Sequence, residues 1–456
     1  MPAAVRPILL LTFVNALGGM LLIPVLPFVV RDLGYNDVVY SLLIAAYPAA
    51  QFFAAPILGG YADYRGRRPV LLISQFGTML SWVLFGAAYF IDGAGLALAV
   101  IVASRIVDGL TGGNQSVAAA YLADVVEGDQ RTRVFSMQGA IAGVALLLAP
   151  SLGSYSAASS VGFLGTAIVA VAISTLTLIG LFTIPESLDE TNRAASFDRN
   201  PFHQLNLVGK ARTLTGAPTL IRLFSIGFLV NVMLSLFSTV AVLWYVDGLG
   251  LSASSTGLMF LATGAFLIFN EMVTLRFFER TLGDVGTLVV GLCVSPIALA
   301  LLSLPRSVPT FLALSFLLNV GFALILPTLQ SVLTRSADER EEGVAQGINT
   351  SVAAIASTVA PIAAGALYAF GEGPASFLVG AAVATVGALL GVSSASLLRE
   401  AIGESAPSHD HTHRHFGPVH ALTQKLSLGR GHFGMRLHGD SLEHHCVRTS
   451  NVRSDG

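Results

Sequence analysis

Charged residues are scarce in this chain, since Asp, Glu, Lys and Arg make up only 11% of its 456 residues. A soluble domain carries about 25% charged residues, so an ordinary water-soluble protein is excluded. The formal net charge is −2, which leaves no basic excess to neutralise the phosphates of a nucleic acid. We therefore expect no nucleic-acid partner.

Cysteine is also scarce. The two cysteines, Cys293 and Cys446, cannot form a disulfide framework and do not have the CxxC spacing that is typical of zinc sites. No set of a nucleophile and a neighbouring base stands out in the remaining sequence. The sequence therefore predicts neither an enzyme nor a bound cofactor.

Apolar residues are abundant: they form 54% of the chain, and the mean hydropathy is +0.72. A helix that crosses a bilayer needs roughly 20 mostly apolar residues. Twelve such runs lie between charged or turn-forming breaks, which predicts an all-α membrane protein with twelve transmembrane helices. The runs are residues 7–30, 38–60, 69–91, 96–122, 133–157, 160–184, 219–246, 253–275, 284–304, 308–334, 343–370 and 374–398.

The predicted helices fall into two groups of six, separated by one polar loop. Gln138 and Pro150 in the fifth helix recur as Gln346 and Pro361 in the eleventh. Features that repeat six helices apart in the same orientation are typical of a parallel repeat with a substrate path between its halves. We predict an N-terminal six-helix bundle (1–184), a cytoplasmic central loop (185–218), a C-terminal six-helix bundle (219–398) and a His-rich, largely disordered cytoplasmic tail (399–456).

Basic residues predict the orientation, because Lys and Arg are enriched in cytoplasmic loops. Loops that follow even-numbered helices carry Arg65, Arg67 and Arg68 among others, whereas the opposite loops hold only Arg31 and Arg306. Both termini and the central loop are therefore predicted to be cytoplasmic. We expect a multi-pass monomer in the lipid bilayer of a plasma or inner membrane.

The loop after the second helix combines glycines with charges. Glycine has no Cβ, so helix ends can pack closely there. An aspartate can accept hydrogen bonds from the N-terminus of a neighbouring helix, and the arginines can pair with an acid at the end of the fourth helix. Simple anchoring by positive charge is the alternative. The residues concerned are Gly59, Asp63, Gly66, Arg67, Arg68 and Asp124.

Ionisable residues inside predicted spans are functional candidates, because their burial in a membrane is costly. Arg105 and Asp108 are three residues apart, so they share a helix face and can pair. Glu271 lies in a mostly apolar run, where a carboxylate can exchange a proton as access alternates. The alternatives are a structural ion pair for Asp108 and a helix end that dips into water for Glu271.

Amide side chains within the spans predict a polar cavity. Amides offer both donors and acceptors, which suits an uncharged or zwitterionic organic substrate. Individual amides can instead join neighbouring helices. The candidate cavity residues are Asn15, Gln51, Asn114, Gln115, Gln138, Asn231, Asn270, Gln330 and Asn349.

These features resemble the major facilitator superfamily, and within it the drug:proton antiporters typified by tetracycline exporters. The run from Gly59 to Arg68 is similar to the superfamily motif G-x-x-x-D-R-x-G-R-R/K, with Tyr64 in place of the usual arginine. The resemblance implies that the charged loop cluster is a conformational latch. It also implies an antiporter motif in the fifth helix, where this chain has Ala149 before the proline instead of glycine. The matching residues are Gly143, Pro150 and Gly153.

The resemblance also has departures that bear on coupling. Tetracycline exporters carry an aspartate in the first helix, where this chain has Asn15, and another in the ninth helix, where this chain has no acid. If protons drive transport, the coupling residues are therefore expected to be Glu271 and Asp108, with Arg105 as the partner of the latter.

The histidines gather in the tail, where nine of the ten follow Glu400. Neutral imidazoles can bind Zn²⁺ or Ni²⁺, but the tail lacks the spacing of a defined metal site, and a solvated tail of incidental composition is the alternative. The weak candidate ligands are His409, His411, His413 and His415.

Together these observations predict a secondary active transporter that works by alternating access and exports a small organic molecule in exchange for protons. An uncoupled facilitator or a symporter of a metabolite on the same fold is one alternative. A membrane receptor or metal sensor that acts through its histidine tail is another.

Overall fold

The structure is a computed structural model that describes residues 4–126, 130–194, 197, 209, 212, 214–304, 307–338 and 341–404. Within these ranges the chain forms helices, turns and bends, and contains no strand. The histidine tail and its four candidate metal ligands lie outside the described residues. So do parts of the central loop.

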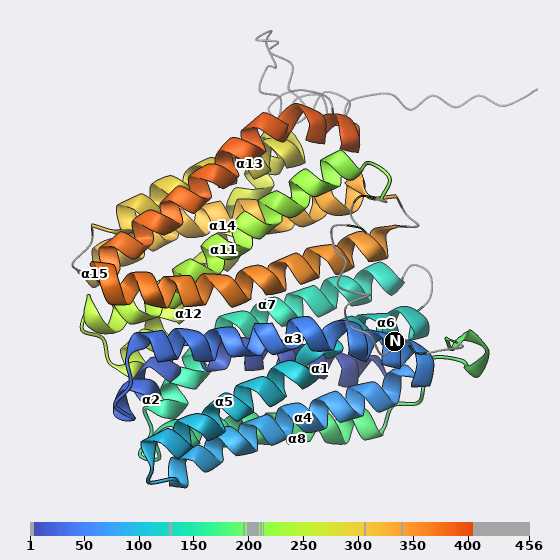
Figure 1. Cartoon of the computed structure of the whole chain (residues 1–456). Coiled ribbons are helices and arrows are strands. Elements are labelled where there is room, and N and C mark those ends of the chain that lie inside the picture. The colour runs from blue at the N-terminus through green and yellow to red at the C-terminus, as the bar shows by residue number, and fades with distance from the viewer. Residues whose placement is uncertain are drawn as a thin grey trace, which may run out of the picture. The chain divides into compact units, whose positions relative to one another are not determined.

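The first half of the bundle contains α1 to α8 (Figure 1). Short 3₁₀ turns follow α4 (Ala88–Phe90) and α5 (Gly112–Asn114), and a third lies in the central loop (Glu190–Asn192). The helices are α1 (Val5–Leu21), α2 (Leu26–Asp32), α3 (Asp37–Arg65), α4 (Arg67–Ala87), α5 (Ala94–Thr111), α6 (Gln115–Val125), α7 (Gln130–Ala157) and α8 (Phe163–Phe182).

The second half contains α11 to α15. A π-helical turn (Glu271–Leu275) joins α12 to α13. Figure 1 shows α15 as two long runs that reverse direction at the left of the view. The helices are α11 (Ala217–Asp247), α12 (Ala253–Asn270), α13 (Arg276–Leu302), α14 (Val308–Ser336) and α15 (Glu342–Ile402).

The prediction of an all-α membrane fold is confirmed. In the described residues, ten helices are long and apolar enough to cross a membrane, and the pair α1 and α2 forms an eleventh if taken as one broken span. One of the ten runs, Ala253–Leu302, contains Gly283 in a non-helical conformation with φ of 71°. This break lies between the predicted spans 253–275 and 284–304, so every predicted span has a helical counterpart.

Two predicted spans are not continuous. The predicted helix 7–30 is broken between α1 and α2, which are bent by 43°, where Pro24 and Pro27 cannot donate backbone hydrogen bonds. The predicted helix 96–122 changes at Gly112 to a 3₁₀ turn. A Cβ on the next residue, Gly113, would lie 2.7 Å from the Cα of Ala55. This close packing of α3 on the 3₁₀ turn requires glycine.

Buried apolar side chains form three clusters. One contains only residues of the second half, from Leu214 to Leu398, and another contains only residues of the first half, from Ala4 to Ile184. The third belongs to the first half except for Leu243 of α11, which is fully buried in it. The second half therefore inserts one side chain of α11 into the core of the first.

Two ends of the bundle can be distinguished by their arginines. Arg31 lies where α2 ends, close to the start of α3 and the end of α11, and we call this the Arg31 end. Arg67 begins α4 directly after the end of α3, and we call the opposite end the Arg67 end.

Candidate functional site

Arg67 is the centre of a charge cluster at the Arg67 end. Its guanidinium forms an ion pair with Asp63, in the last turn of α3, and its Nε lies 3.5 Å from Oδ2 of Asp124 at the end of α6. The Arg67 side chain is largely buried, with 14% of its surface exposed. The structure thus brings together three of the six predicted latch residues, from three different helices.

Glu186 completes this cluster, and the sequence reasoning missed it. Its carboxylate accepts hydrogen bonds from the backbone N–H groups of Arg67 (2.8 Å) and Arg68 (3.1 Å), which are the first residues of α4. The sequence had assigned such a helix-terminus role to Asp63, but Glu186 performs it for α4. An acid directly after the predicted span 160–184 was the available signal.

The remaining latch residues have different surroundings. Gly66 has φ of +115°, and a Cβ there would collide with the Glu186 carboxylate, so glycine is required at this junction. The Arg68 guanidinium donates to the carbonyl of Phe182 (3.1 Å) and ties α4 to the end of α8. Gly59, in contrast, has open space around it, and no close helix approach explains it.

The second half contains a similar junction. Gly283 has φ of +71°, and a Cβ there would collide with Glu404, which accepts from the backbone N–H of Val285 (3.2 Å). Arg335 pairs with Asp284 (3.1 Å) and donates to the carbonyl of Ile402 (3.0 Å). Arg67 and Glu186 are 119 residues apart, and so are Val285 and Glu404. The equal spacing supports a repeat of the two halves.

Arg105 and Asp108 form a buried ion pair within α5. Their closest atoms are 3.4 Å apart, and each side chain has 5% of its surface exposed. The guanidinium carbon also lies 5.2 Å from the ring centroid of Trp82 in α4, in the geometry of a cation–π contact. Nε and Nη2 of Arg105 are buried without a hydrogen-bond partner among the described residues. Arg105 therefore has two buried N–H groups within the first half that are available to a further acceptor.

Glu271 occupies the first position of the π-helical turn, and its side chain is exposed. Leu258 and Phe269 lie on an exposed apolar face of α12. Because each residue of an α-helix turns by about 100°, Glu271 lies about 200° from Phe269. It shares this opposite side with Phe260 and Leu267, which pack against the second-half core. Glu271 is thus exposed, but on the side of its helix opposite the apolar face of Leu258 and Phe269.

Four of the nine predicted cavity amides lie close together in the first half. Asn15 donates to Oδ1 of Asn114 (2.7 Å), and Gln51 donates to the carbonyl of Gly112, two residues before Asn114 (3.0 Å). Gln138 of α7 donates to Thr12 of α1 (3.1 Å). Asn114 is fully buried, and its Nδ2 has no acceptor among the described residues.

The other predicted amides are separate from this group. Asn231 and Asn270 donate to carbonyl groups one turn earlier in their own helices. Asn349 lies against Gly227, so it faces α11. Gln115 and Gln330 are exposed. The structure therefore gathers four of the five candidate amides of the first half and none of the four of the second.

The three residues of the predicted motif in the fifth span also have different surroundings. Pro150 is buried within α7, and a Cβ on Gly153 would collide with the backbone carbonyl of Leu21 in α1. Gly143 is exposed, with nothing near its missing Cβ. Only Gly153 is required by helix packing.

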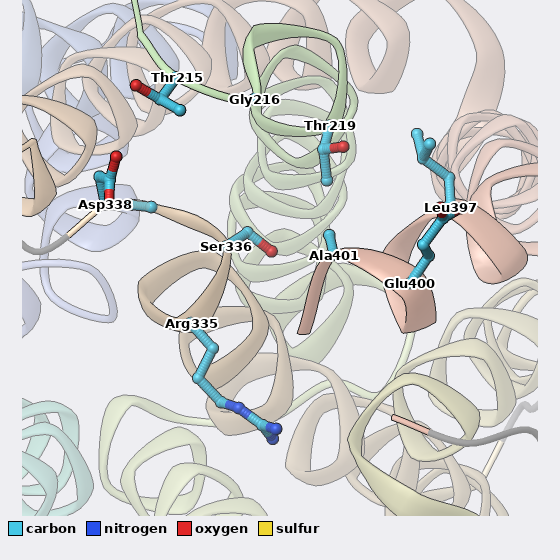
Figure 2. Close-up of a pocket in the computed structure, with 10 residues that line it drawn as sticks. Thr215, Gly216, Thr219, Arg335, Ser336, Asp338, Leu397, Glu400 and Ala401 are labelled. Carbon is cyan, nitrogen blue, oxygen red and sulfur yellow. The ribbon is translucent and has the colours of Figure 1, made fainter. Parts of the chain in front are cut away.

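A cavity of about 470 Å³ lies at the Arg67 end of the second half (Figure 2). It is lined by the start of α11, the end of α14 and the end of α15, with Thr219, Ser336 and Glu400 among its polar side chains. None of the predicted cavity amides contributes to it. Among the described residues, no cluster of metal-ligating side chains is found.

The helical architecture, two similar halves and charged junctions at one end define a polytopic membrane protein of the transporter type. Comparison with known families identifies it further: the Major Facilitator Superfamily matches residues 8–294 and 276–429. The chain belongs to the major facilitator superfamily, and it is a membrane transporter rather than an enzyme.

Similar proteins include resistance proteins of two kinds. The chain is 28% identical to the tetracycline resistance protein, class C, of Escherichia coli over 360 residues, which cover 78% of this chain and 87% of that protein. It is 24% identical to the quinolone resistance protein NorA of Staphylococcus aureus, with 82% and 92% covered.

Solved structures share the fold. The human organic anion transporter MFSD10 (TETRAN) superposes with a TM-score of 0.66 at 21% identity, covering 86% of this chain and all (100%) of that chain. A D-xylose–proton symporter superposes with a TM-score of 0.67 at 17% identity, covering 88% and 97%.

Proposed function

We propose that this protein exports a small organic molecule, uncharged or zwitterionic, in exchange for protons, by alternating access of one site between its halves. The observation that carries the proposal is the buried Arg105–Asp108 pair, in the same half as the amide group around Asn114. Buried charge in a membrane protein is costly and marks coupling or substrate sites. The similarity to tetracycline and quinolone resistance proteins supports drug export as the direction.

The proposed arrangement places the Arg67 end in the cytoplasm, together with both termini and the central loop. The excess of arginine at this end supports that orientation. The N-terminal bundle (1–184), the central loop (185–218), the C-terminal bundle (219–398) and the tail (399–456) are the proposed parts. The membrane is proposed to be a plasma or inner membrane, and the protein a monomer.

Glu271 is proposed as the principal proton carrier. Its side chain is exposed within an otherwise apolar segment, so its carboxylate is accessible to a proton. It also begins a π-helical turn, a distortion that is frequent at functional sites. Arg105 and Asp108 are proposed to sense whether the site is occupied, because breaking their pair exposes two charges to a bound substrate.

A symporter or an uncoupled facilitator is the second candidate. The specific observation in its favour is the fold similarity to a D-xylose–proton symporter, together with Ala149 where antiporters carry glycine. A sensor that acts through the histidine tail is the remaining alternative.

The test is accumulation of tetracycline and of a quinolone in everted membrane vesicles, with and without a protonophore. Export predicts accumulation that the protonophore abolishes. Glu271→Gln is expected to abolish accumulation while retaining exchange of labelled substrate, because glutamine keeps the size and hydrogen bonding but does not titrate. Glu279→Gln, the same change eight residues later, serves as the matched control and is expected to pump normally.

Uphill transport by Glu271→Gln would exclude Glu271 as the carrier. If Asp108→Asn also pumped on a proton gradient, proton exchange would be excluded and the facilitator would take its place.

A further inference from the structure

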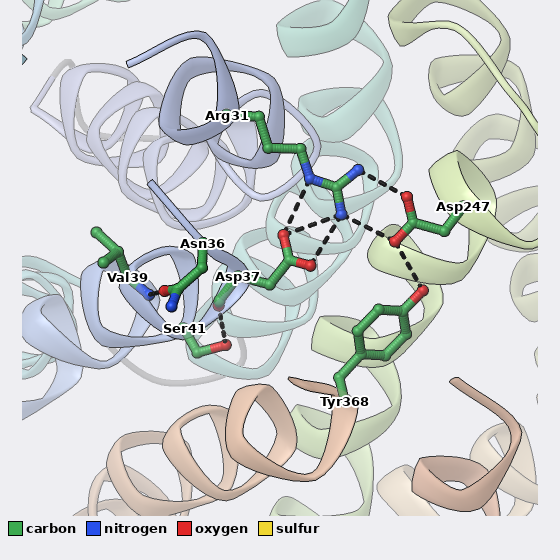
Figure 3. A network of polar contacts seen from close by, with 7 residues as sticks. All are labelled: Arg31, Asn36, Asp37, Val39, Ser41, Asp247 and Tyr368. Atoms are coloured by element: carbon green, nitrogen blue, oxygen red, sulfur yellow. Dashed lines mark hydrogen bonds and ion pairs between the residues drawn. The ribbon is translucent and has the colours of Figure 1, made fainter. Parts of the chain in front are cut away.

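Four side chains form a polar network that joins the two halves at the Arg31 end (Figure 3). Within the first half, the Arg31 guanidinium donates to both carboxylate oxygens of Asp37, at 3.0 and 2.9 Å. Across to the second half, it donates to both oxygens of Asp247, at 2.7 and 2.8 Å. The hydroxyl of Tyr368 donates to Asp247 at 3.0 Å. Arg31 is therefore the only cation in a group with two carboxylates.

Other contacts between the halves lie at the same end. Ser151 in the last third of α7 donates to the carbonyl of Gly257, at the start of α12 (2.9 Å). A Cβ on Gly365 of α15 would collide with Ser41 of α3, so these helices nearly touch. Leu243, one turn before Asp247, is buried in the first-half core. Polar and apolar contacts thus close this end together.

The Arg67 end differs in this respect. The hydrogen bonds and ion pairs of Arg67, Glu186 and Asp124 join residues of the first half, and those of Arg335 and Glu404 join residues of the second. Hydrogen bonds and ion pairs of Arg31 and Ser151 do cross from one half to the other, and both residues lie at the Arg31 end.

Arg31 balances the charges of this network, since it lies between two carboxylates. Bidentate pairs between arginine and carboxylate have a fixed geometry and are among the stronger polar contacts. Without Arg31, Asp37 and Asp247 would face each other across the junction as two like charges. Without Asp37, the cross-half pair of Arg31 and Asp247 would be a balanced pair of opposite charges.

We propose that Arg31, Asp37, Asp247 and Tyr368 form an interhalf lock, which holds the Arg31 end closed and dissociates whenever that end opens. The lock rests on the proposed alternating access. Asp37 positions the guanidinium, Asp247 receives it from the other half, and Tyr368 fixes the Asp247 carboxylate. Alternation then consists of exchanging this network for contacts at the opposite end.

The test measures the width of the Arg31 end directly, in purified full-length protein in lipid nanodiscs. Spin labels are attached at Asp92→Cys in the first half and Leu304→Cys in the second, both exposed positions, after Cys293→Ser and Cys446→Ser. Pulsed electron resonance then gives the distribution of distances between the labels.

Arg31→Gln and Asp247→Asn are each expected to raise the ratio of long to short distances on the order of tenfold, a change of about 1.4 kcal/mol. Asp37→Asn is the matched comparison, since it removes the same charge from the same arginine but within one half, and a smaller rise than in either of those two variants is expected. Exchange of the two charges, Arg31→Asp with Asp247→Arg, is expected to restore the short distances.

Parent distances in both Arg31→Gln and Asp247→Asn would overturn the lock, as would an equal opening caused by Asp37→Asn. The vesicle assay separates this result from the proposed function. If the lock variants open but the parent protein shows no proton-driven accumulation, the export proposal is excluded and the lock is retained. If the distances are unchanged in a protein that pumps, the lock alone is excluded.

Discussion

At the scale of single residues, the Arg67 end depends on one carboxylate that serves several donors. Glu186 accepts from the N–H groups of Arg67, Arg68, Ser187 and Leu188. This satisfies the start of α4, where backbone donors have no partner within the helix. Four donors that lose one acceptor must find water or remain unpaired.

We therefore expect Glu186→Ala to lower the free energy of unfolding by about 0.5–2 kcal/mol, the range for removal of a helix N-terminal acceptor. Thermal unfolding in detergent measures the effect. Glu190→Ala is the control, because Glu190 pairs with Arg193 but is 88% exposed, and a change near zero is expected there. An equal change in melting temperature for both variants would contradict the role of Glu186 as acceptor for the start of α4.

The buried pair in α5 gives a second prediction. Arg105→Met leaves Asp108 charged and without its partner, which costs about 3–5 kcal/mol for a buried pair. Asp108→Leu in the same chain removes the stranded charge, so the double variant is expected to recover most of the folded yield. Fluorescence-detected gel filtration measures this yield.

Transport by the double variant then separates the two interpretations of the pair. A pair that senses occupancy leaves the recovered protein inactive, while a purely structural pair leaves it active.

The residues that sequence reasoning found and missed differ in a physical way. Arg105 and Asp108 were predicted because their contact is local, three residues along one helix. Glu186 and Glu404 were missed because each binds a backbone N–H group 119 residues earlier in the chain, that of Arg67 and that of Val285, and no periodic pattern spans such a distance. The exposure of Glu271 could not be foreseen either, since an apolar run does not tell which side of a helix faces protein.

At the scale of an element, α7 shows that glycines in one motif have unequal roles. Gly153 lies against the carbonyl of Leu21, whereas Gly143 faces open space. A methyl group can be added at Gly143 without any neighbour moving, but at Gly153 it requires α1 and α7 to separate.

Gly153→Ala is therefore expected to destabilise the protein by about 1–3 kcal/mol through overpacking. Gly143→Ala is expected to stabilise it by up to about 1 kcal/mol, because alanine favours the helical state over glycine. Melting temperatures of the two variants, measured in one detergent, should move in opposite directions. A fall for both would show that the packing of α7 has been misassigned.

The elements were largely predictable, and their interruptions were not. Hydropathy located all twelve spans, because length and polarity define a membrane helix. The break between α1 and α2 and the 3₁₀ turn at Gly112 arise from prolines and from close packing on α3. Pro24 and Pro27 were visible in the sequence as a signal for the first interruption. The 3₁₀ turn depends on a neighbour 58 residues away, since Gly113 contacts Ala55.

At the scale of the whole molecule, the end of α15 marks where the transporter stops and the tail begins. The helix continues to Ile402, past the predicted limit of 398, and the carbonyl of Ile402 binds Arg335. Glu404, two residues after the helix, binds the start of the ninth span. The residues that the structure describes end at Glu404.

Deletion of residues 407–456 is therefore expected to leave flux in vesicles unchanged. Deletion of residues 399–456, which also removes Ile402 and Glu404, is expected to reduce the amount of folded protein severalfold. Flux per folded molecule is measured for both. Loss of function in the shorter deletion would instead favour the sensor that acts through the histidine tail.

The position of Glu186 and Glu404 near the close of each half also has a consequence for synthesis. Ribosomes add about 5–20 residues per second, so each carboxylate emerges roughly 6–24 s after the amides that it binds, 119 residues earlier. The first half can therefore complete its own junction before any helix of the second half exists. Glu404, which follows the last helix, completes the junction of the second half. A chain interrupted before Glu404 therefore has a complete first half and an incomplete second half, which quality-control proteases can attack.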